Sequence, residues 1–296
     1  MMKRVLIWGF GNYYHRYINL IKLAEHQGDF QVVGIAAKEG NYSSVDAYPF
    51  FPAEDISQLE FDAVLVTAIK FFDEIAGFLQ KFGVNRQQIV PVTIFDVPGY
   101  TLEKYMQLLE SRITIISNNC WGGLLYHALK LPFSSPFINM YVEDDNYLDL
   151  LENFSDKIQC PIKYWEDEYN DVEQFSYPVF DLDGVKLHMN HYRDVTEAKF
   201  KWDNRCKRIN FDNILFEMYT ESEQNARRFA KLPFPNKLCL FPSPLDEECV
   251  ISTDIYFGEY DSHKFWEIAN GSANGQYPLF DLVELALNKI IKMRVR

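Results

Sequence analysis

The chain has 296 residues, of which 48% are hydrophobic and 16% aromatic, and its formal net charge is −13. This length exceeds the usual size of one hydrophobic core, so two domains are expected, and the apolar content excludes a disordered protein. The acidic balance argues against a nucleic-acid partner, because duplex binding relies on clustered lysine and arginine. It favours small molecules or other proteins as partners.

The cysteines and the apolar runs indicate the compartment. The five cysteines are widely scattered and form no zinc-binding spacing. The start of the chain leads directly into a predicted strand, without the longer apolar stretch of a signal peptide, and no apolar run approaches the roughly 18 residues of a membrane span. We therefore expect free thiols, a cytoplasmic location and no transmembrane segment. The oligomeric state is left open.

Strand and helix patterns alternate through the first part of the chain. Strands are expected at residues 4–8, 31–37, 61–68 and 89–92, with helices at 14–24 and 72–82. Such alternation predicts a parallel sheet wound with right-handed crossovers. We therefore predict an α/β protein whose residues 1–98 form a Rossmann-like domain.

The turn after the first strand carries only part of the dinucleotide-binding fingerprint G-x-G-x-x-G. Gly9 and Gly11 are followed by Tyr14, where a third glycine would let the helix approach the strand. The second strand is followed by Lys38 instead of the acidic residue that binds the adenine ribose. Both departures argue against NAD, and no cofactor is identified. Gly9 and Gly11 form either a tight strand-to-helix turn or a phosphate site at a helix N-terminus.

A second α/β domain with a mixed sheet is predicted for residues 99–296. The boundary falls at residues 96–100, where proline and glycine together break both helix and strand. Strands are expected at 113–117, 137–142, 178–180, 185–189, 214–218, 237–241 and 250–256, and helices at 102–110, 147–154, 195–209, 222–231 and 281–291.

Three segments of this second domain resemble one bacterial family. They read IISNNCWGGLLYHALKLPFSSPFINM, YPVFDLDGVKLHMNHYRDVTEAKFKWDNRCKRIN and YPLFDLVELALN. In this order, from about Arg112 to Asn288, they are similar to the family labelled exopolysaccharide biosynthesis protein, domain of unknown function 1919. The resemblance implies a role in making or decorating surface polysaccharide and implies no defined mechanism. Residues 3–95, with FDAVLVTA and GVNRQQI, resemble N-terminal modules of bacterial sugar-modifying and polysaccharide-assembly proteins.

The segment between the strand at 113–117 and the following helix is the first candidate site. Asparagine is a good helix N-cap, and glycines in an opening turn leave backbone N–H groups accessible at the carboxyl edge of a sheet. We predict an anion-binding turn made by Asn118, Asn119, Gly122 and Gly123. The alternative is a capped, tightly turned helix. Cys120 is not expected to be a nucleophile, because free cysteines are usually buried and inert.

His188 and His191 lie at the end of the strand expected at 185–189. Side chains alternate along a strand, so these two histidines cannot share a metal unless the strand ends between them. No metal site is predicted. The histidines are either hydrogen-bonded structural groups or acid–base and phosphate contacts. His191, at the exit of the strand, is the stronger catalytic candidate, followed by His188.

The helix expected at 195–209 brings cations close to the core. Arg205 falls inside the apolar stripe between Trp202 and Ile209, and Arg208 lies on its edge. A buried guanidinium needs a partner, because an unpaired buried charge is costly. That partner is either a structural carboxylate or an anionic ligand, for which arginine is well suited.

An acidic run, residues 143–145, follows the strand expected at 137–142. It resembles the acidic pair with which many glycosyltransferases hold a metal and a nucleotide diphosphate. The favoured interpretation is simpler: Asp144 or Asp145 caps a helix that starts at Tyr147.

Two functions from different classes remain open. The first is a transferase in surface-polysaccharide assembly that uses an anionic activated donor such as a sugar nucleotide, bound between the Asn119–Gly123 turn and Arg205 and Arg208. The second is a non-catalytic or regulatory sugar-nucleotide-binding partner of a biosynthetic enzyme.

Overall fold

The computed structural model describes residues 2–40, 42–253 and 262–292. They fall into two units, residues 1–110 and 111–296, each with its own sheets. Within the described residues, every helix falls short of the length and apolar character needed to cross a lipid bilayer.

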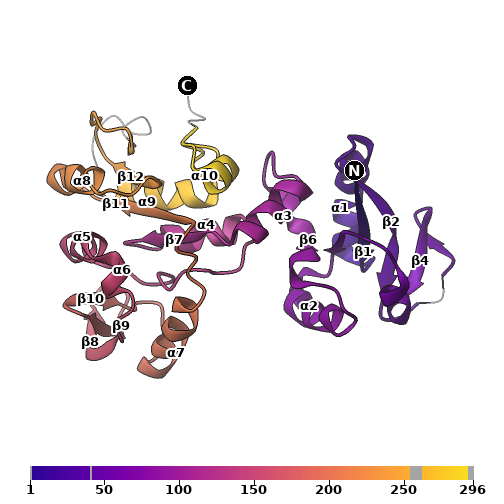
Figure 1. The fold of residues 1–296 in the computed structure, drawn as a ribbon, viewed down its shortest axis with the longest axis horizontal. Helices are drawn as coiled ribbons and strands as arrows, with labels where there is room; N and C mark the ends of the chain where they lie inside the picture. The colour runs from indigo at the N-terminus through magenta and orange to yellow at the C-terminus, as the bar shows by residue number, and fades with distance from the viewer. Residues whose placement is uncertain (1, 41, 254–261, 293–296) are drawn as a thin grey trace. The chain divides into compact units, whose positions relative to one another are not determined.

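The first unit is built on a six-stranded sheet with the strand order β3-β4-β2-β1-β5-β6 (Figure 1). All of its neighbouring strands pair in parallel except β3 and β4, which are antiparallel. The predicted Rossmann-like parallel sheet is therefore confirmed. Its elements are β1 (Lys3–Trp8), α1 (Asn12–His26), β2 (Phe30–Ala37), β3 (Ser44–Val45), β4 (Tyr48–Pro52), β5 (Ala63–Val66), α2 (Phe72–Lys81), β6 (Ile89–Pro91) and α3 (Leu102–Ser111), with short 3-10 turns at Ala53–Gln58, Ile69–Phe71, Arg86–Gln88 and Val92–Asp96.

The second unit contains a parallel sheet, β13-β12-β11-β7, and an antiparallel sheet, β10-β9-β8. The α/β class is confirmed, with parallel and antiparallel pairing in two separate sheets of this unit. Its elements are β7 (Thr114–Ser117), α4 (Trp121–Ala128), α5 (Asp144–Glu152), α6 (Phe154–Lys157), β8 (Lys163–Asn170), β9 (Phe175–Leu182), β10 (Val185–His188), α7 (Val195–Cys206), β11 (Ile214–Tyr219), α8 (Glu223–Ala230), β12 (Lys237–Phe241), β13 (Val250–Ser252), α9 (Ser262–Asn274) and α10 (Leu282–Asn288).

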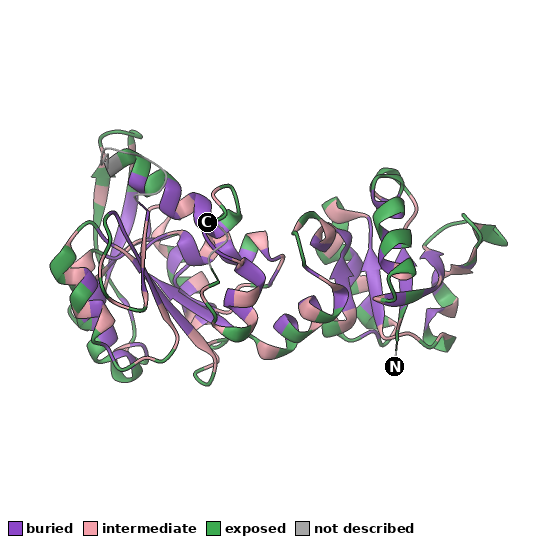
Figure 2. Ribbon diagram, turned by 90° about the horizontal axis from the view of Figure 1, so that it is seen from above, coloured by how far each residue is buried: buried purple, intermediate pink, exposed green. Residues whose placement is uncertain are grey.

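The core of the second unit lies between its two sheets. Phe180 from β9, Phe216 from β11 and Trp202 from α7 belong to one buried cluster. Strands β7, β11 and β12 are buried along most of their length, whereas β8 is mostly exposed (Figure 2). Helices α4 and α9 pack together on the other face of the parallel sheet, where Phe265 contacts Tyr219. The site residues that follow β7 and β11 are therefore held between packed layers.

Several predicted elements differ from the structure. Residues 137–142 form no ladder beyond a single bridge between Tyr141 and His188, because Asn139 adopts a positive φ of 59° that interrupts the extended run. The helix expected to start at Tyr147 starts at Asp144. Strands β3, β4 and β8 and helix α9 were not predicted. Part of the strand expected at 250–256 lies outside the described residues.

Candidate functional site

A cavity of about 320 Å³ lies at the carboxyl edge of the parallel sheet in the second unit. Strands β7 and β11 end beside it, at Ser117 and Tyr219, and open α/β sheets bind ligands at this edge. Its lining residues come from segments far apart in the chain: Asn118, Asn119, Cys120, Tyr141, Val142, Glu143, Asp144, Asn190, His191, Tyr219, Trp266 and Asn270.

Asn118 joins three elements in the wall of this cavity. Its Nδ2 donates to Asp144 Oδ1 and to the Tyr219 carbonyl, both at 3.1 Å. Its Oδ1 accepts from the Tyr219 N–H at 3.2 Å and from Asn119 Nδ2 at 2.5 Å. The side-chain amide of Asn118 thus makes its hydrogen bonds within the protein, and its role is to position β7, β11 and α5.

Asp144 extends this network from the first turn of α5. It accepts hydrogen bonds from the Thr220 hydroxyl and from Asn225 Nδ2 as well as from Asn118. Burial raises the pKa of the Asp144 carboxyl, and these hydrogen bonds oppose that rise. Among the described residues, no three or more His, Cys, Asp or Glu side chains are grouped so that they could hold a metal ion.

Of the predicted anion-binding turn, Asn118 and Asn119 line the cavity, whereas Gly122 and Gly123 do not. Two backbone N–H groups at the start of α4 also have partners within the chain. The Trp121 N–H donates to Asn119 Oδ1 at 2.7 Å, and the Gly122 N–H donates to Ser117 Oγ at 3.2 Å. A Cβ at Gly122 would lie 2.8 Å from Ser117 Oγ, so the glycine also permits α4 to pack on β7. Gly123 has no such restriction, since its Cβ would make only ordinary contacts with Ile138.

Two residues that line the cavity have buried carbonyl oxygens without a partner. Within the described part of the chain, neither Asn190 Oδ1 nor Asn270 Oδ1 accepts a hydrogen bond. Leaving a buried acceptor unsatisfied costs about 1–3 kcal/mol. The two oxygens come from different elements, the exit of β10 and α9, and both belong to residues that line the cavity.

Glu217 lies behind the cavity wall, on β11. It is fully buried, and neither carboxyl oxygen has a hydrogen-bond partner among the described residues. Burial raises the pKa of Glu217 well above its usual range. The Asn119 side chain, which is close but outside hydrogen-bond geometry, offsets this only in part. Burial without a hydrogen-bond partner therefore favours the neutral form of the Glu217 carboxyl.

Aromatic faces complete the cavity. Tyr141, Tyr219 and the half-exposed Trp266 all line it. Among the described lining residues none is lysine or arginine, whereas Glu143 and Asp144 supply carboxylates. This mixture of flat aromatic surface and acceptor oxygens fits a ligand rich in hydroxyl groups better than a bare anion.

The sequence model of the family described as Domain of unknown function (DUF1919) matches residues 95–285. The chain belongs to this family. A second model, described as C2185-like, N-terminal, matches residues 1–90. The chain is also 34% identical over 169 residues to an uncharacterized protein of Haemophilus influenzae, covering 56% of this chain and 71% of the relative. All described residues that line the cavity lie within the DUF1919 match.

The two histidines of the DUF1919 domain have different surroundings. Strand β10 ends at His188, so the strand does end between them. His191 is exposed and lines the cavity. His188 is buried beneath the cavity wall, stacked on Tyr141 with ring centroids 4.4 Å apart, and its Nδ1 lies 2.9 Å from Glu168 Oε2.

Arg205 and Arg208 do not line the DUF1919 cavity. Arg205 is buried and donates to the Tyr192 hydroxyl at 2.6 Å, and its guanidinium lies 5.3 Å from the centre of the Phe133 ring. It makes no ion pair with a described carboxylate. Arg208 donates to the Phe133 carbonyl at 3.2 Å. Within the described residues, Arg205 thus contacts a hydroxyl and an aromatic ring.

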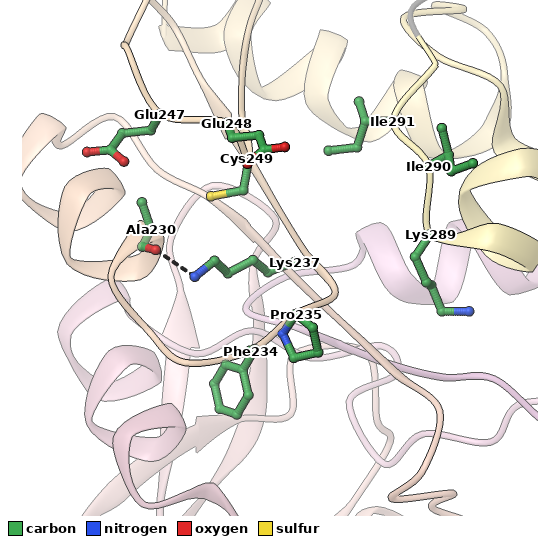
Figure 3. A pocket seen from close by; sticks show the side chains of 10 residues that line it. All are labelled: Ala230, Phe234, Pro235, Lys237, Glu247, Glu248, Cys249, Lys289, Ile290 and Ile291. Atoms are coloured by element: carbon green, nitrogen blue, oxygen red, sulfur yellow. Dashed lines mark hydrogen bonds between the residues drawn. The ribbon is translucent and has the colours of Figure 1, made fainter.

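A larger cavity, of about 650 Å³, lies near the starts of β12 and β13 in the DUF1919 domain (Figure 3). Its two lysine amines point away from one another. Lys237 donates to the carbonyls of Ala230 and Leu232, and Lys289 donates to the Ala286 carbonyl at 2.8 Å. Burial lowers the pKa of Lys289 to about 8. Both amines therefore bind carbonyls near the C-terminal ends of helices, a common structural role of lysine.

The glycine turn of the first unit borders a cavity of about 280 Å³, which Gly11 lines. Gly9 has a φ of +90°, and a Cβ there would lie 3.0 Å from Thr67 Oγ1, so this turn requires glycine. Tyr14 is fully buried and its hydroxyl donates to Asp46 at 2.9 Å. A packed aromatic ring thus occupies the position of the third glycine in the dinucleotide-binding fingerprint.

Sequence reasoning missed much of the DUF1919 cavity. Trp266 and Asn270 lie on α9, which was not predicted because weak helix formers such as Gly271 and Asn270 interrupt its pattern. Tyr141 and Asn190 carry no recognisable motif. Glu217 did leave a signal: a single carboxylate inside the apolar run of β11, in the middle of a predicted buried strand.

Proposed function

We propose that this chain is a transferase of surface-polysaccharide assembly, and that the cavity at the carboxyl edge of its DUF1919 sheet binds a sugar. The observation that carries the proposal is the pair of buried, unpartnered oxygens on Asn190 and Asn270. Sugar hydroxyls are donors that would satisfy them. A site built to hydrogen-bond a hydroxyl rejects analogues that lack it, because its own acceptors are then left unpaired.

The aromatic residues support the same class of ligand. Trp266 and Tyr219 offer apolar ring faces on which the C–H face of a pyranose can pack, while the amide oxygens take its hydroxyls. The carboxylates of Glu143 and Asp144 would repel a phosphate inside the cavity. If the donor is a sugar nucleotide, we therefore expect its sugar inside the cavity and its diphosphate outside.

A second candidate is a sugar-nucleotide-binding partner without catalytic activity. One observation favours it: burial raises the pKa of Cys120, the thiol that lines the cavity, so this cysteine is not a thiolate nucleophile at neutral pH.

The test is a thermal-shift screen of the full chain against UDP-, GDP- and CMP-sugars and against methyl glycosides, followed by turnover assays of every stabilising pair. Asn270→Leu should abolish the thermal shift, whereas Asn274→Leu, an exposed change on the same helix, should retain it. Binding with turnover supports the transferase, and binding without turnover supports the second candidate. Equal shifts in both variants would exclude this cavity as the binding site.

A further inference from the structure

A chain of hydrogen bonds leads away from the cavity through Tyr141. The Tyr141 and Tyr177 hydroxyl oxygens are 2.9 Å apart, and the Tyr177 hydroxyl donates to Glu168 Oε2 at 2.7 Å. His188 Nδ1 lies 2.9 Å from the same carboxylate oxygen. Tyr141 lines the cavity, whereas 37% of the Glu168 side chain is exposed. The chain therefore connects the cavity to solvent.

The fold holds these four side chains in register. Glu168 on β8 lies opposite Tyr177 on β9 in the antiparallel ladder. Tyr141 and His188 exchange both backbone hydrogen bonds, each at 3.0 Å, and their rings stack with an interplanar angle of 8°. Backbone pairing thus holds Glu168 beside Tyr177 and His188 beside Tyr141, and the contact between the Tyr141 and Tyr177 hydroxyls joins the two pairs.

The number of available protons determines which group donates in each hydrogen bond of this relay. A tyrosine hydroxyl has one proton, and an ionised carboxylate only accepts. Because Tyr177 gives its proton to Glu168, Tyr141 must be the donor in its contact with Tyr177. The Tyr141 oxygen then keeps its lone pairs for a proton donor in the cavity.

The geometry points to Tyr141 as the catalytic acid–base residue of the cavity, with Tyr177 and Glu168 as the relay behind it and His188 as a positioning residue. This inference rests on the proposed transferase function. As an acceptor hydroxyl attacks the anomeric carbon of a glycosyl phosphate donor, a new C–O bond forms and the phosphate leaves with the electrons of the broken C–O bond. The hydroxyl proton passes to Tyr141, the Tyr141 proton to Tyr177, and the Tyr177 proton to Glu168.

The titration behaviour of the two phenols agrees with a relay. Burial raises the pKa of Tyr141, and the hydrogen bond with Tyr177 partly offsets this. Burial, Tyr141 and Glu168 all raise the pKa of Tyr177. Neither phenol is stable as a phenolate in this setting. Protons would therefore pass through both hydroxyls, and the charge change would appear at the half-exposed Glu168.

The connection can be tested on the ligand-free full chain by NMR of protein labelled with ¹³Cζ-tyrosine. Tyr141→Phe and Tyr177→Phe assign the two resonances. Glu168→Gln should shift both, because the change is transmitted through the chain, whereas Glu173→Gln, in the turn between β8 and β9, should shift neither. An unmoved Tyr141 resonance in Glu168→Gln would overturn the relay regardless of any ligand.

Turnover assays then test whether the relay carries protons during catalysis, with UDP-, GDP- and CMP-sugars as donors and methyl glycosides as acceptors. Tyr177→Phe should lower kcat about 100-fold or more and leave the acceptor KM within about threefold. Glu168→Gln, which removes the final proton acceptor of the relay, should lower kcat in the same way and also leave the acceptor KM within about threefold. If Tyr177→Phe retains the kcat of the wild-type protein, the relay is overturned and the proposed transferase function stands. Absence of wild-type turnover overturns the proposed transferase and the relay with it, whatever the NMR result.

Discussion

Asn118 and Tyr219 are joined by two hydrogen bonds across the carboxyl edge of the parallel sheet: Asn118 Nδ2 donates to the Tyr219 carbonyl, and the Tyr219 N–H donates to Asn118 Oδ1. The backbone register between β7 and β11 ends before these two residues, at Ser117 and Glu217. The Asn118 side chain therefore continues the pairing of the two strands beyond the point where their backbones separate.

Removing this side chain should weaken both the sheet edge and the cavity. We expect Asn118→Ala to lower the free energy of unfolding by about 2–4 kcal/mol, because the Tyr219 backbone groups and Asp144 lose buried partners. Urea unfolding followed by circular dichroism measures this. Asn153→Ala, an exposed control, should change stability by less than about 0.5 kcal/mol. A loss as small as the control's would contradict the positioning role of Asn118.

Glu217 should make stability depend on pH in an unusual direction. Its pKa is raised in the folded state, so above the unfolded-state pKa of about 4.3 the folded protein retains a proton that the unfolded chain has released. Stability from this group therefore falls as pH rises, by up to about 1.4 kcal/mol per pH unit. Glu217→Gln, which has the shape of the neutral acid, should gain stability relative to wild type between pH 5 and pH 8. Urea unfolding curves of both proteins at pH 5 and pH 8 test this. If the stability difference between Glu217→Gln and wild type is the same at both pH values, the raised pKa of Glu217 is contradicted.

Substitution of Arg205 tests whether this residue stabilises the fold or contacts a ligand. Arg205→Met retains the aliphatic packing and loses the hydrogen bond to Tyr192 and the contact with Phe133. We expect a cost of about 1–2 kcal/mol and unchanged sugar binding, since Arg205 does not line the cavity. A melting curve and a ligand titration on this one variant are sufficient. A cost of about 3–5 kcal/mol would indicate a stranded carboxylate partner instead.

The first unit should not bind NAD or NADP with micromolar affinity. Tyr14 fills the space that the third glycine leaves open in dinucleotide-binding turns, and its hydroxyl is held by Asp46. Lys38, which follows the second strand, pairs with Glu74. Isothermal titration calorimetry with both nucleotides checks this, and a micromolar Kd for either one would contradict it.

The sequence allowed the Rossmann-like sheet and most of the parallel strands of the second unit to be predicted, because continuous apolar runs such as residues 63–66 are the signature of strands buried on both faces. It also identified the segment after β7 as part of a site. It could not identify Asn190 or Asn270, since an asparagine is distinctive only when its buried oxygen has no partner, and that is a tertiary property. Arg205 lies on the buried side of its helix as the periodicity predicted, but periodicity cannot show whether a hydroxyl, a carboxylate or a ligand will face it.

The exposure of β8 has a consequence for the behaviour of the protein at high concentration. In the described structure β8 is an edge strand that pairs with β9 on one side only, so its other side offers backbone groups to which a second chain could add. Its sequence, KYWEDEYN, combines aromatic residues that favour such addition with the adjacent charges of Glu166, Asp167 and Glu168. Strands of two molecules aligned there would bring like charges together. The acidic residues of β8, which made this strand hard to predict from the sequence, thus oppose aggregation through its free edge.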